Sequence, residues 1–330
     1  MKTNARFINT EKIEGYVYSI GSSFNELSER VSGENSKNPG TKYIAGDLDI
    51  AVDEEGLNVV TVHYRYVGEN TSKGSPNNTY AVLKKIIDNP SKYWINGGKE
   101  NAFKVQCTGV ALAVNDFIAA DGSKVAAVRN ENGFCSFVTE FSPEVERNTF
   151  STDMLITKVT HVDANPEKNI KEDYTNVSGC VFGYGTTPVL LPVTFVVRNN
   201  MGMEYFEGLD ASSSNPVFTK VWGRINCMTI KTERTEESAF GPAAVQTYER
   251  KSREYTITGT AKVPYDFGDE EVLTREDVLK MSQDREVMLA EIEQRYNDRK
   301  NSNSMNFSAP TSNNPVSQMG KTVPKGDFNF

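Results

Sequence analysis

Apolar and polar residues alternate along three runs near the start of the chain, and this pattern predicts three β-strands. The runs are Lys12–Ile20, Tyr43–Val52 and Leu57–Val67. A short helical run over Asn78–Asp88 follows, and the strand pattern returns at Ala102–Val114 and Lys124–Val138. The acidic segment that ends at Gly56 predicts a hairpin between the second and third runs.

A helix between the third and fourth of five strands is the order of a Greek-key barrel of the OB type. Such barrels bind extended polymers, above all single-stranded nucleic acid, on an open face. Polar loops over Gly33–Gly40 and Glu69–Asn78 flank the predicted hairpin and would frame that face. We therefore expect residues 1–147 to form an OB-like domain that binds nucleic acid.

The next part of the chain is again rich in strand-forming residues. The runs are Met154–Val162, Val177–Tyr184, Val189–Arg198, Phe218–Lys231 and Ser252–Val263, and Glu233–Ala244 is interpreted as a mobile hairpin loop. They predict a second β-rich domain over residues 148–265. Phe103-Lys104-Val105 before Thr108-Gly109-Val110 is echoed by Phe218-Thr219-Lys220-Val221 before Trp222-Gly223-Arg224. Whether the second domain is also an OB barrel stays open at this point.

From Asp269 the apolar residues recur at three- and four-residue steps, which predicts an amphipathic helix over residues 266–300. Thr274 followed by Asp277 is a plausible N-cap. The helix either packs on the second domain or pairs with another copy or a partner. Residues 301–330 are rich in Asn, Ser, Pro and Gly, and we expect a disordered tail.

Length and composition place the chain among soluble globular proteins. At 330 residues it exceeds the usual ~100–150 residues of one domain. The apolar runs are too short for a membrane span, and the N-terminus lacks the apolar core of a signal peptide. Four cysteines stand far apart and without nearby histidines, which argues against zinc and favours reduced thiols in a cytoplasm.

The net charge of −8 argues against a strongly electrostatic nucleic-acid binder. Much of the negative charge is local, because residues 266–300 hold eleven acidic and six basic residues, a net charge of −5. A basic groove on the first 265 residues is compatible with that distribution.

The chain carries no convincing catalytic motif. His63 and His161 lie beside no cysteine or serine motif, and no phosphate-binding loop or metalloprotease motif is present. Asp47 and Asp49 share one strand face and could hold a metal, but they are more simply explained as the solvent-facing residues of an alternating strand. A metal-dependent nuclease that uses them is the third hypothesis. We expect no enzyme, no cofactor and no metal.

Aromatic and basic residues on the same strands are better candidates, because base stacking on an aromatic ring contributes ~1–3 kcal/mol per base. Alternation predicts that Tyr16 and Tyr18 share one strand face, and that Tyr64 and Tyr66 share another. Arg65, which lies between the second pair, and Lys104 are predicted phosphate ligands. The sharpest signal is Lys220-Val221-Trp222-Gly223-Arg224, which places two cations and a tryptophan on one face. An amphipathic outer face with a partly buried Trp222 is the alternative.

The chain ends Gly326-Asp327-Phe328-Asn329-Phe330. Together with the strand order, this end resembles bacterial and phage single-stranded DNA-binding proteins, which have an OB domain, a low-complexity linker and an acidic tip closed by Phe. The resemblance implies that the barrel binds single-stranded DNA and that Asp327, Phe328 and Phe330 dock replication and repair proteins. The single acid at this tip, the nearby Lys325 and the second domain depart from the family pattern.

The leading hypothesis is therefore non-enzymatic, sequence-tolerant binding of single-stranded DNA in phage or plasmid replication, recombination or repair, in the host cytoplasm. The predicted nucleic-acid ligands are Tyr16, Tyr18, Tyr64, Arg65, Tyr66, Lys104, Lys220, Trp222 and Arg224. The alternative is a phage structural or assembly protein, whose long helix forms homo-oligomers. The sequence does not decide between DNA and RNA.

Overall fold

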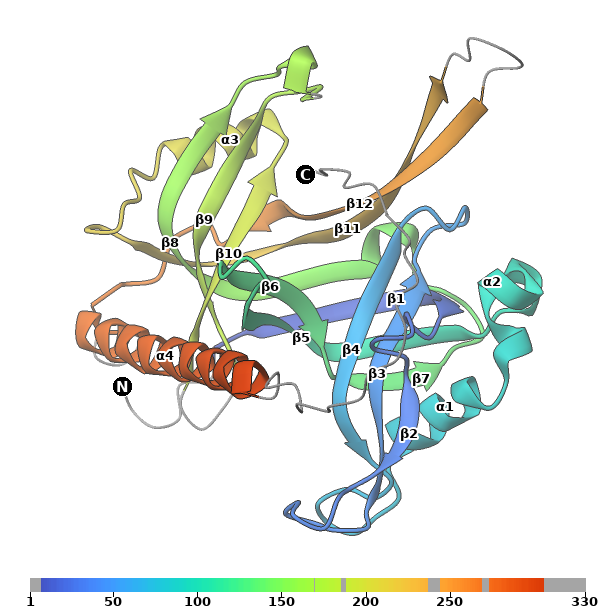
Figure 1. Cartoon of the computed structure of the whole chain (residues 1–330). Helices are drawn as coiled ribbons and strands as arrows, with labels where there is room; N and C mark the ends of the chain where they lie inside the picture. Colours follow the sequence, from blue (N-terminus) through green and yellow to red (C-terminus); the bar gives the residue numbers. More distant parts are fainter. Residues whose placement is uncertain (1–6, 169, 185–187, 237–243, 269–272, 306–330) are drawn as a thin grey trace, which may run out of the picture.

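The computed structural model describes residues 7–168, 170–184, 188–236, 244–268 and 273–305 (Figure 1). The strands of the first half are β1 (Asn9–Ser19), β2 (Ser28–Val31), β3 (Lys42–Ala51), β4 (Val59–Gly68), β5 (Lys104–Ile118), β6 (Lys124–Glu131) and β7 (Phe134–Phe137). Those of the second half are β8 (Asn148–Val162), β9 (Tyr174–Phe182), β10 (Leu190–Val197), β11 (Val217–Glu236) and β12 (Ala244–Thr260). The helices are α1 (Asn78–Ile87), α2 (Trp94–Gly97), α3 (Asn200–Glu207) and α4 (Arg275–Met305), with short 3-10 turns η1 (Pro90–Lys92), η2 (Lys99–Asn101), η3 (Glu144–Glu146) and η4 (Pro166–Lys168).

Five strands of the first half close into a ring. β1 pairs with β3, β3 with β4, β4 with β6, β6 with β5, and β5 again with β1. Every pair is antiparallel except β4–β6, and α1 lies in sequence between the third and fourth strands of the ring. This is the wiring of an OB barrel, so the predicted OB-like fold is confirmed.

Five strands of the second half repeat the same wiring. β8 pairs with β9, β9 with β10, β10 with β12, β12 with β11, and β11 again with β8. Here too one pair, β10–β12, is parallel, and α3 follows the third strand. The β-rich second half, whose fold the sequence left open, is therefore a second OB-like ring.

The two rings meet along their first strands. Asn9–Ile13 of β1 pair antiparallel with Asn148–Thr152 of β8, and this seam joins both rings into one twelve-stranded sheet. The main hydrophobic core is also shared, because Ile13 and Val17 of the first ring belong to the same buried cluster as Phe195 and Ile257 of the second. Burial of such a continuous apolar interior couples the two rings.

The fourth and fifth strands of the second ring are longer than their sequence pattern predicts. The segment Glu233–Ala244 was interpreted as a loop, but β11 continues to Glu236 and β12 begins at Ala244, with cross-strand pairing up to these residues. The interpretation as a loop was wrong for the paired residues. The sequence there, Glu233-Arg234-Thr235-Glu236, is entirely polar, so it lacks the apolar alternation that marks a half-buried strand.

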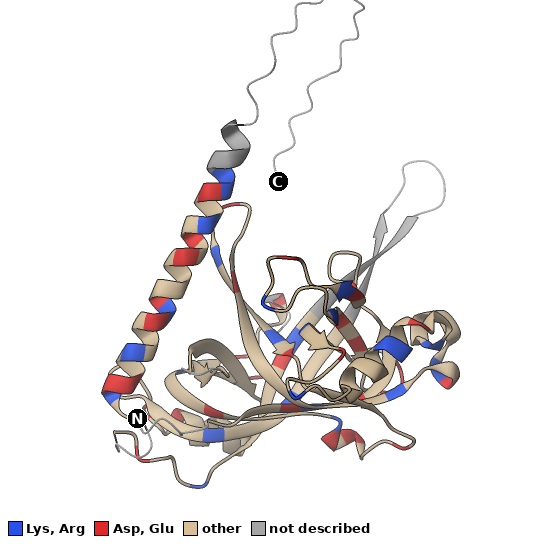
Figure 2. Ribbon diagram, turned by 90° about the horizontal axis from the view of Figure 1, so that it is seen from below, with Lys and Arg blue, Asp and Glu red and all other residues tan. Residues whose placement is uncertain are grey.

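The long helix α4 begins where the sequence predicted an N-cap. Asp277 N–H donates to Thr274 Oγ1 over 3.1 Å, and Thr274 Oγ1–H donates to Asp277 Oδ2 over 2.7 Å. The helix packs on both rings, with Met281 buried beside Phe218 and with Arg285 paired to Asp116 at 2.6 Å. Acidic and basic residues alternate along its length, as Figure 2 shows. None of the described helices combines the length and apolar character of a membrane span.

Candidate nucleic-acid interface

Lys220, Trp222 and Arg224 share the outer face of β11, as alternation predicts. The residues between and beside them face inward, where Val221 and Ile225 are fully buried. Trp222 keeps 40% of its surface exposed, which is unusual for a large aromatic side chain at the centre of a sheet. The strand therefore presents a cation, an indole and a second cation in a line.

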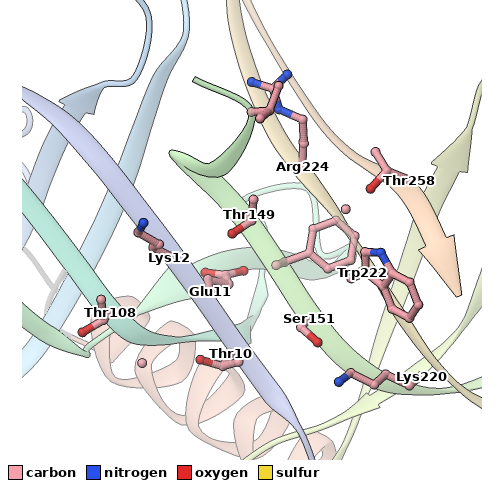
Figure 3. A pocket seen from close by; sticks show the side chains of 14 residues that line it. Thr10, Glu11, Lys12, Thr108, Thr149, Ser151, Lys220, Trp222, Arg224 and Thr258 are labelled. Atoms are coloured by element: carbon pink, nitrogen blue, oxygen red, sulfur yellow. The ribbon is translucent and has the colours of Figure 1, made fainter. Parts of the chain in front are cut away.

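This face of β11 forms one side of a groove that crosses the seam between the rings. We call it the seam groove; it measures about 850 Å³ and is lined by side chains of five adjacent strands (Figure 3). The main polar lining residues are Thr108, Thr10, Lys12, Thr149, Ser151, Lys220, Trp222, Arg224 and Thr258. Most of the lining surface is apolar, and the hydroxyls and cations set in it can donate hydrogen bonds to phosphate oxygens.

Strand register explains how these side chains come together. Lys12 stands opposite Thr108 on one side and Thr149 on the other, and Thr149 stands opposite Arg224. In the next row, Ser151 stands opposite both Thr10 and Trp222. Because neighbouring strands lie ~4.8 Å apart, each row spans about 10–15 Å of continuous surface.

The indole of Trp222 lies across the backbone of β12. A Cβ atom added to Gly259 would come within 2.5 Å of Trp222 Nε1 and Cε2, so only glycine leaves room for the ring there. Trp222 pairs with Gly259 while Gly223 pairs with Ile257, so Thr258 is the extra residue of a β-bulge. The glycine supports one side of the indole, and the remaining exposed surface faces the groove.

The basic groups of the groove keep most of their charge available. Among the described residues, the Arg224 guanidinium donates to neutral oxygens alone, Asn148 Oδ1 at 3.2–3.3 Å and the Glu144 carbonyl at 3.2 Å. Lys220 makes no ion pair with any residue that the structure describes. Lys12 is the exception, since its ammonium lies 3.1 Å from Glu14.

An acidic residue lies at the floor of the groove without cancelling this charge. Glu11 is 2% exposed, and neither carboxyl oxygen has a hydrogen-bond partner in the described part of the chain. Burial raises the pKa of Glu11 from 4.5 to about 8, against the opposing field of Arg253. At pH 7 the group is therefore mostly protonated and neutral.

The predicted tyrosines of β4 do not share a face. Tyr64 is fully buried with its hydroxyl 3.4 Å from Cys107 Sγ, whereas Tyr66 is 48% exposed and stacks on Tyr43 with ring centroids 4.5 Å apart. The register shifts between Ile44 and Gly46, so strict alternation fails at this point. Burial, followed by the field of Cys107, raises the pKa of Tyr64 well above 10. Without exposed surface, Tyr64 offers no ring to a base.

Arg65 and the paired aspartates of β3 are engaged with neighbours inside the protein. The Arg65 guanidinium lies 2.6 Å from the buried carboxylate of Glu131, which offsets its charge. Asp49 accepts hydrogen bonds from Ser19 and Thr61, and Asp47 bonds to His63 Nδ1 at 2.5 Å. Among the described residues, no group of three or more Asp, Glu, His or Cys side chains is arranged to hold a metal ion.

Tyr16, Tyr18 and Lys104 lie together at the other end of β1, around a residue that the sequence reasoning missed. Trp94 of α2 contacts Tyr16 edge-on at 5.3 Å between ring centroids and Tyr18 at 6.3 Å. Trp94 was overlooked because it sits in a short helical segment rather than on a strand. The signal available was its rarity, since the chain has two tryptophans. The predicted docking residues Asp327, Phe328 and Phe330 lie outside the described residues.

Comparison with known proteins gives one family and a distant structural likeness. The chain resembles the crystal structure of a deletion mutant of the single-stranded DNA binding protein from Thermus aquaticus, with a TM-score of 0.43 and 12% sequence identity. That likeness covers 80% of this chain and 98% of the other. No curated protein matches the sequence. The family model described as YorF matches residues 21–295, most of the length of the chain. The protein therefore belongs to the YorF family.

Proposed function

We propose that the protein binds single-stranded nucleic acid, in the first place single-stranded DNA, in the seam groove and without catalysis. A base stacks on the exposed surface of Trp222, and phosphates contact Lys220, Arg224 and Lys12. Every base has an aromatic face and every nucleotide a phosphate, so such a site is tolerant of sequence. An activity of this kind serves wherever duplex DNA is opened, as in replication, recombination and repair.

One observation carries the proposal: the line of Lys220, Trp222 and Arg224 opens onto a groove of about 850 Å³ that crosses both rings. The side chains of that line are at least partly exposed, and no ion pair with a described residue offsets the charge of its two cations. A ligand with phosphates and aromatic bases requires both. The indole is supported by Gly259 and remains 40% exposed, and the Arg224 guanidinium is held by neutral oxygens.

Charge sets the expected salt dependence. Three phosphate contacts on a single strand give a slope of about −2 for log K against log salt concentration. Affinity is then expected to fall by about an order of magnitude between roughly 50 and 200 mM salt. The net charge of −8 keeps the long-range field unfavourable, so binding depends on this local surface.

The test is fluorescence anisotropy of a labelled oligo-dT titrated with the full chain at low and moderate salt, with duplex DNA of the same length alongside. We expect salt-weakened binding to the single strand, and Trp222→Ala to reduce affinity ~5- to 100-fold, which corresponds to ~1–3 kcal/mol of stacking. Phe24→Ala is the matched control, because Phe24 is 94% exposed and does not line the groove. Absence of binding at low salt, or equal binding by Trp222→Ala and the parent, would overturn the proposal.

A further inference from the structure

A second cluster of aromatic rings and cations lies on the outside of the first ring. We call it the Trp94 cluster, and it consists of Trp94, Tyr16, Tyr18, Phe141, Lys104 and Arg147. Tyr16 forms its centre, with edge-on contacts to Trp94 and to Phe141, whose centroid lies 4.8 Å away. Trp94, Tyr18 and Phe141 are each partly exposed.

Cations lie over two of these rings, Tyr16 and Phe141. Lys104 Nζ lies 5.9 Å from the Tyr16 centroid and 5.2 Å from that of Phe141, and the Arg147 guanidinium lies 4.8 Å from Phe141. Glu54 accepts hydrogen bonds from Arg147 and Lys99 at 3.1 and 3.3 Å. Lys104 makes no ion pair with any described residue, so its charge is open to an anion.

The Trp94 cluster and the seam groove lie on the same face of one strand. Along β1, Ile13 and Val17 point into the core, whereas Lys12 and Tyr16 occupy the opposite, outward positions. Lys12 lines the groove and Tyr16 anchors the cluster, four residues and ~13 Å further along the strand. Ser142 joins the two, since its hydroxyl accepts from Lys12 Nζ at 2.7 Å next to Phe141.

Both tryptophans of the chain are supported in the same way. A Cβ atom added to Gly56 would lie 3.2 Å from Trp94 Cζ2, and the φ of +71° at Gly56 also favours glycine there. Gly259 plays this part for Trp222. In both places the backbone approaches one part of the indole closely and cations flank the aromatic group.

We propose that the Trp94 cluster is a second base-stacking site, occupied by later nucleotides of the same strand that binds Trp222. The inference rests on the proposed function and extends it: a single strand follows the outward face of β1 from the seam groove to Trp94. Lys104 contacts a phosphate at that end. The binding site then spans both rings, and short oligonucleotides fill only part of it.

The two tryptophans make a direct test available. Trp222→Phe and Trp94→Phe each leave one indole as the fluorescent reporter and keep an aromatic ring in place of the other. With oligo-dT of about 5 nucleotides, we expect quenching of Trp222 in the variant Trp94→Phe and little change in Trp94. With about 20 nucleotides, both reporters are quenched, because stacked bases quench indole emission and the longer strand reaches both sites.

Affinity measurements separate direct contact from a remote change in emission. Trp94→Ala and Lys104→Gln are each expected to weaken binding of the longer oligo-dT about five- to tenfold and to leave the short one unchanged. Lys104→Gln keeps the aromatic packing of Trp94, so it tests the site even where Trp94→Ala destabilises the fold. Phe24→Ala again serves as the control.

The outcomes distinguish this inference from the proposed function. If long oligo-dT quenches Trp222 but neither quenches Trp94 nor loses affinity in Lys104→Gln, the second site does not exist and the proposed function stands. If no oligo-dT binds or quenches either indole, both are wrong.

Discussion

The two rings share one wiring and differ in what their fourth strands present to solvent. Each first strand begins with a buried asparagine that fastens the fourth strand of its own ring. Asn9 Nδ2 donates to the Leu112 carbonyl at 2.8 Å, and Asn148 Nδ2 donates to the Ile225 carbonyl at 2.6 Å. These two asparagines therefore define how the rings align.

The alignment places the three residues Lys220, Trp222 and Arg224 at the positions of Gln106, Thr108 and Ala111. Ser151 and Lys12 are equivalent, because each stands three residues after the asparagine of its strand. Ser151 pairs with Trp222 and Lys12 pairs with Thr108, so Trp222 and Thr108 are equivalent as well. The sequence echo around Gly109 and Gly223 agrees with this alignment at Thr108 and Trp222 only, because the register makes Gly223 equivalent to Val110. The first ring has neutral polar and small side chains where the second has two cations and an indole.

The comparison teaches that wiring alone does not make a binding surface. Both rings bring their fourth strands alongside the seam, and the backbone is arranged alike. At the three positions beside the seam, only the second ring carries cations and an indole, which attract phosphates and bases. The proposed activity thus depends on three side chains, while the duplicated barrel supplies their positions.

The rings also differ in the middle of the seam, where equivalent residues of the two first strands pair with each other. Glu11 of β1 pairs directly with Phe150 of β8, and the alignment makes these two residues equivalent. The first ring therefore buries a carboxyl where the second buries a phenyl group. Phe150 packs against Phe195 and Tyr255, whereas both Glu11 oxygens lack a hydrogen-bond partner among the described residues.

The largest expected effect follows from that asymmetry. The pKa of Glu11 is about 8 in the folded protein and 4.5 when exposed, so below pH 4.5 its ionisation takes nothing from the free energy of unfolding. The cost grows as pH rises from 4.5 to 8 and then stays constant, reaching at most about 5 kcal/mol. Glu11→Gln should therefore have the parent's stability near pH 4.5 and exceed it by several kcal/mol at pH 8.5, as measured by urea unfolding.

Glu14 on the same strand is the matched control, with the opposite sign. Burial acts to raise the pKa of Glu14, but hydrogen bonds from Ser142, Lys12 and Gln106 outweigh it and leave the pKa below 4.5. Its contribution is present above pH 4.5 and is lost as pH falls through the lowered pKa. Glu14→Gln should destabilise the protein at pH 7. Equal pH profiles for Glu11→Gln and the parent would show that Glu11 is ionised and solvated in the fold.

The next effect tests whether three side chains make the difference between the rings. Replacing Lys220 by Gln, Trp222 by Thr and Arg224 by Ala gives β11 the side chains of β5. We expect the combined variant to bind oligo-dT at least 100-fold more weakly in anisotropy titrations, because a stacking contact and two phosphate contacts are lost together. The control, Phe24→Ala outside the groove, should change affinity by less than about twofold.

If the triple variant kept the affinity of the parent, the binding surface would have to lie elsewhere on the rings. A thermal unfolding midpoint close to that of the parent is expected as well, since two of the three positions are only partly buried and Trp222 is 40% exposed. Loss of folding would be seen there and not confused with loss of binding.

Much of the fold was predictable because period-2 alternation marks strands that have one buried face. The strand order with its intervening helix identified the first OB-like ring, and the Thr274–Asp277 cap located the start of α4. The second ring escaped prediction as a barrel, because its identity rests on strand pairings such as Val196 with Thr256, which join residues 60 positions apart. No local pattern encodes such a pairing.

The candidate site divides in the same way. Alternation places Lys220, Trp222 and Arg224 on one face, and it holds because the extra residue of the bulge at that point lies in β12 and not in β11. The same argument failed for Tyr66, where the pairing partners Ile44 and Gly46 bracket a register shift. The sequence also gave no means of seeing that Lys12 belongs beside Arg224, because that row is assembled by the seam between the rings.

The smallest effect concerns one charge and sharpens the comparison of Lys220 with Gln106. Lys220→Gln should lower affinity for oligo-dT only several-fold at low salt, because one phosphate contact is lost. The slope of log K against log salt concentration should become less steep by about 0.7, the value expected per contact on a single strand. Gln106→Ala, at the equivalent position of the first ring, should leave the slope unchanged. The measurement is a series of anisotropy titrations from about 25 to 200 mM salt. An unchanged slope in Lys220→Gln would mean that Lys220 does not contact phosphate, and that Arg224 and Lys12 carry the electrostatic attraction alone.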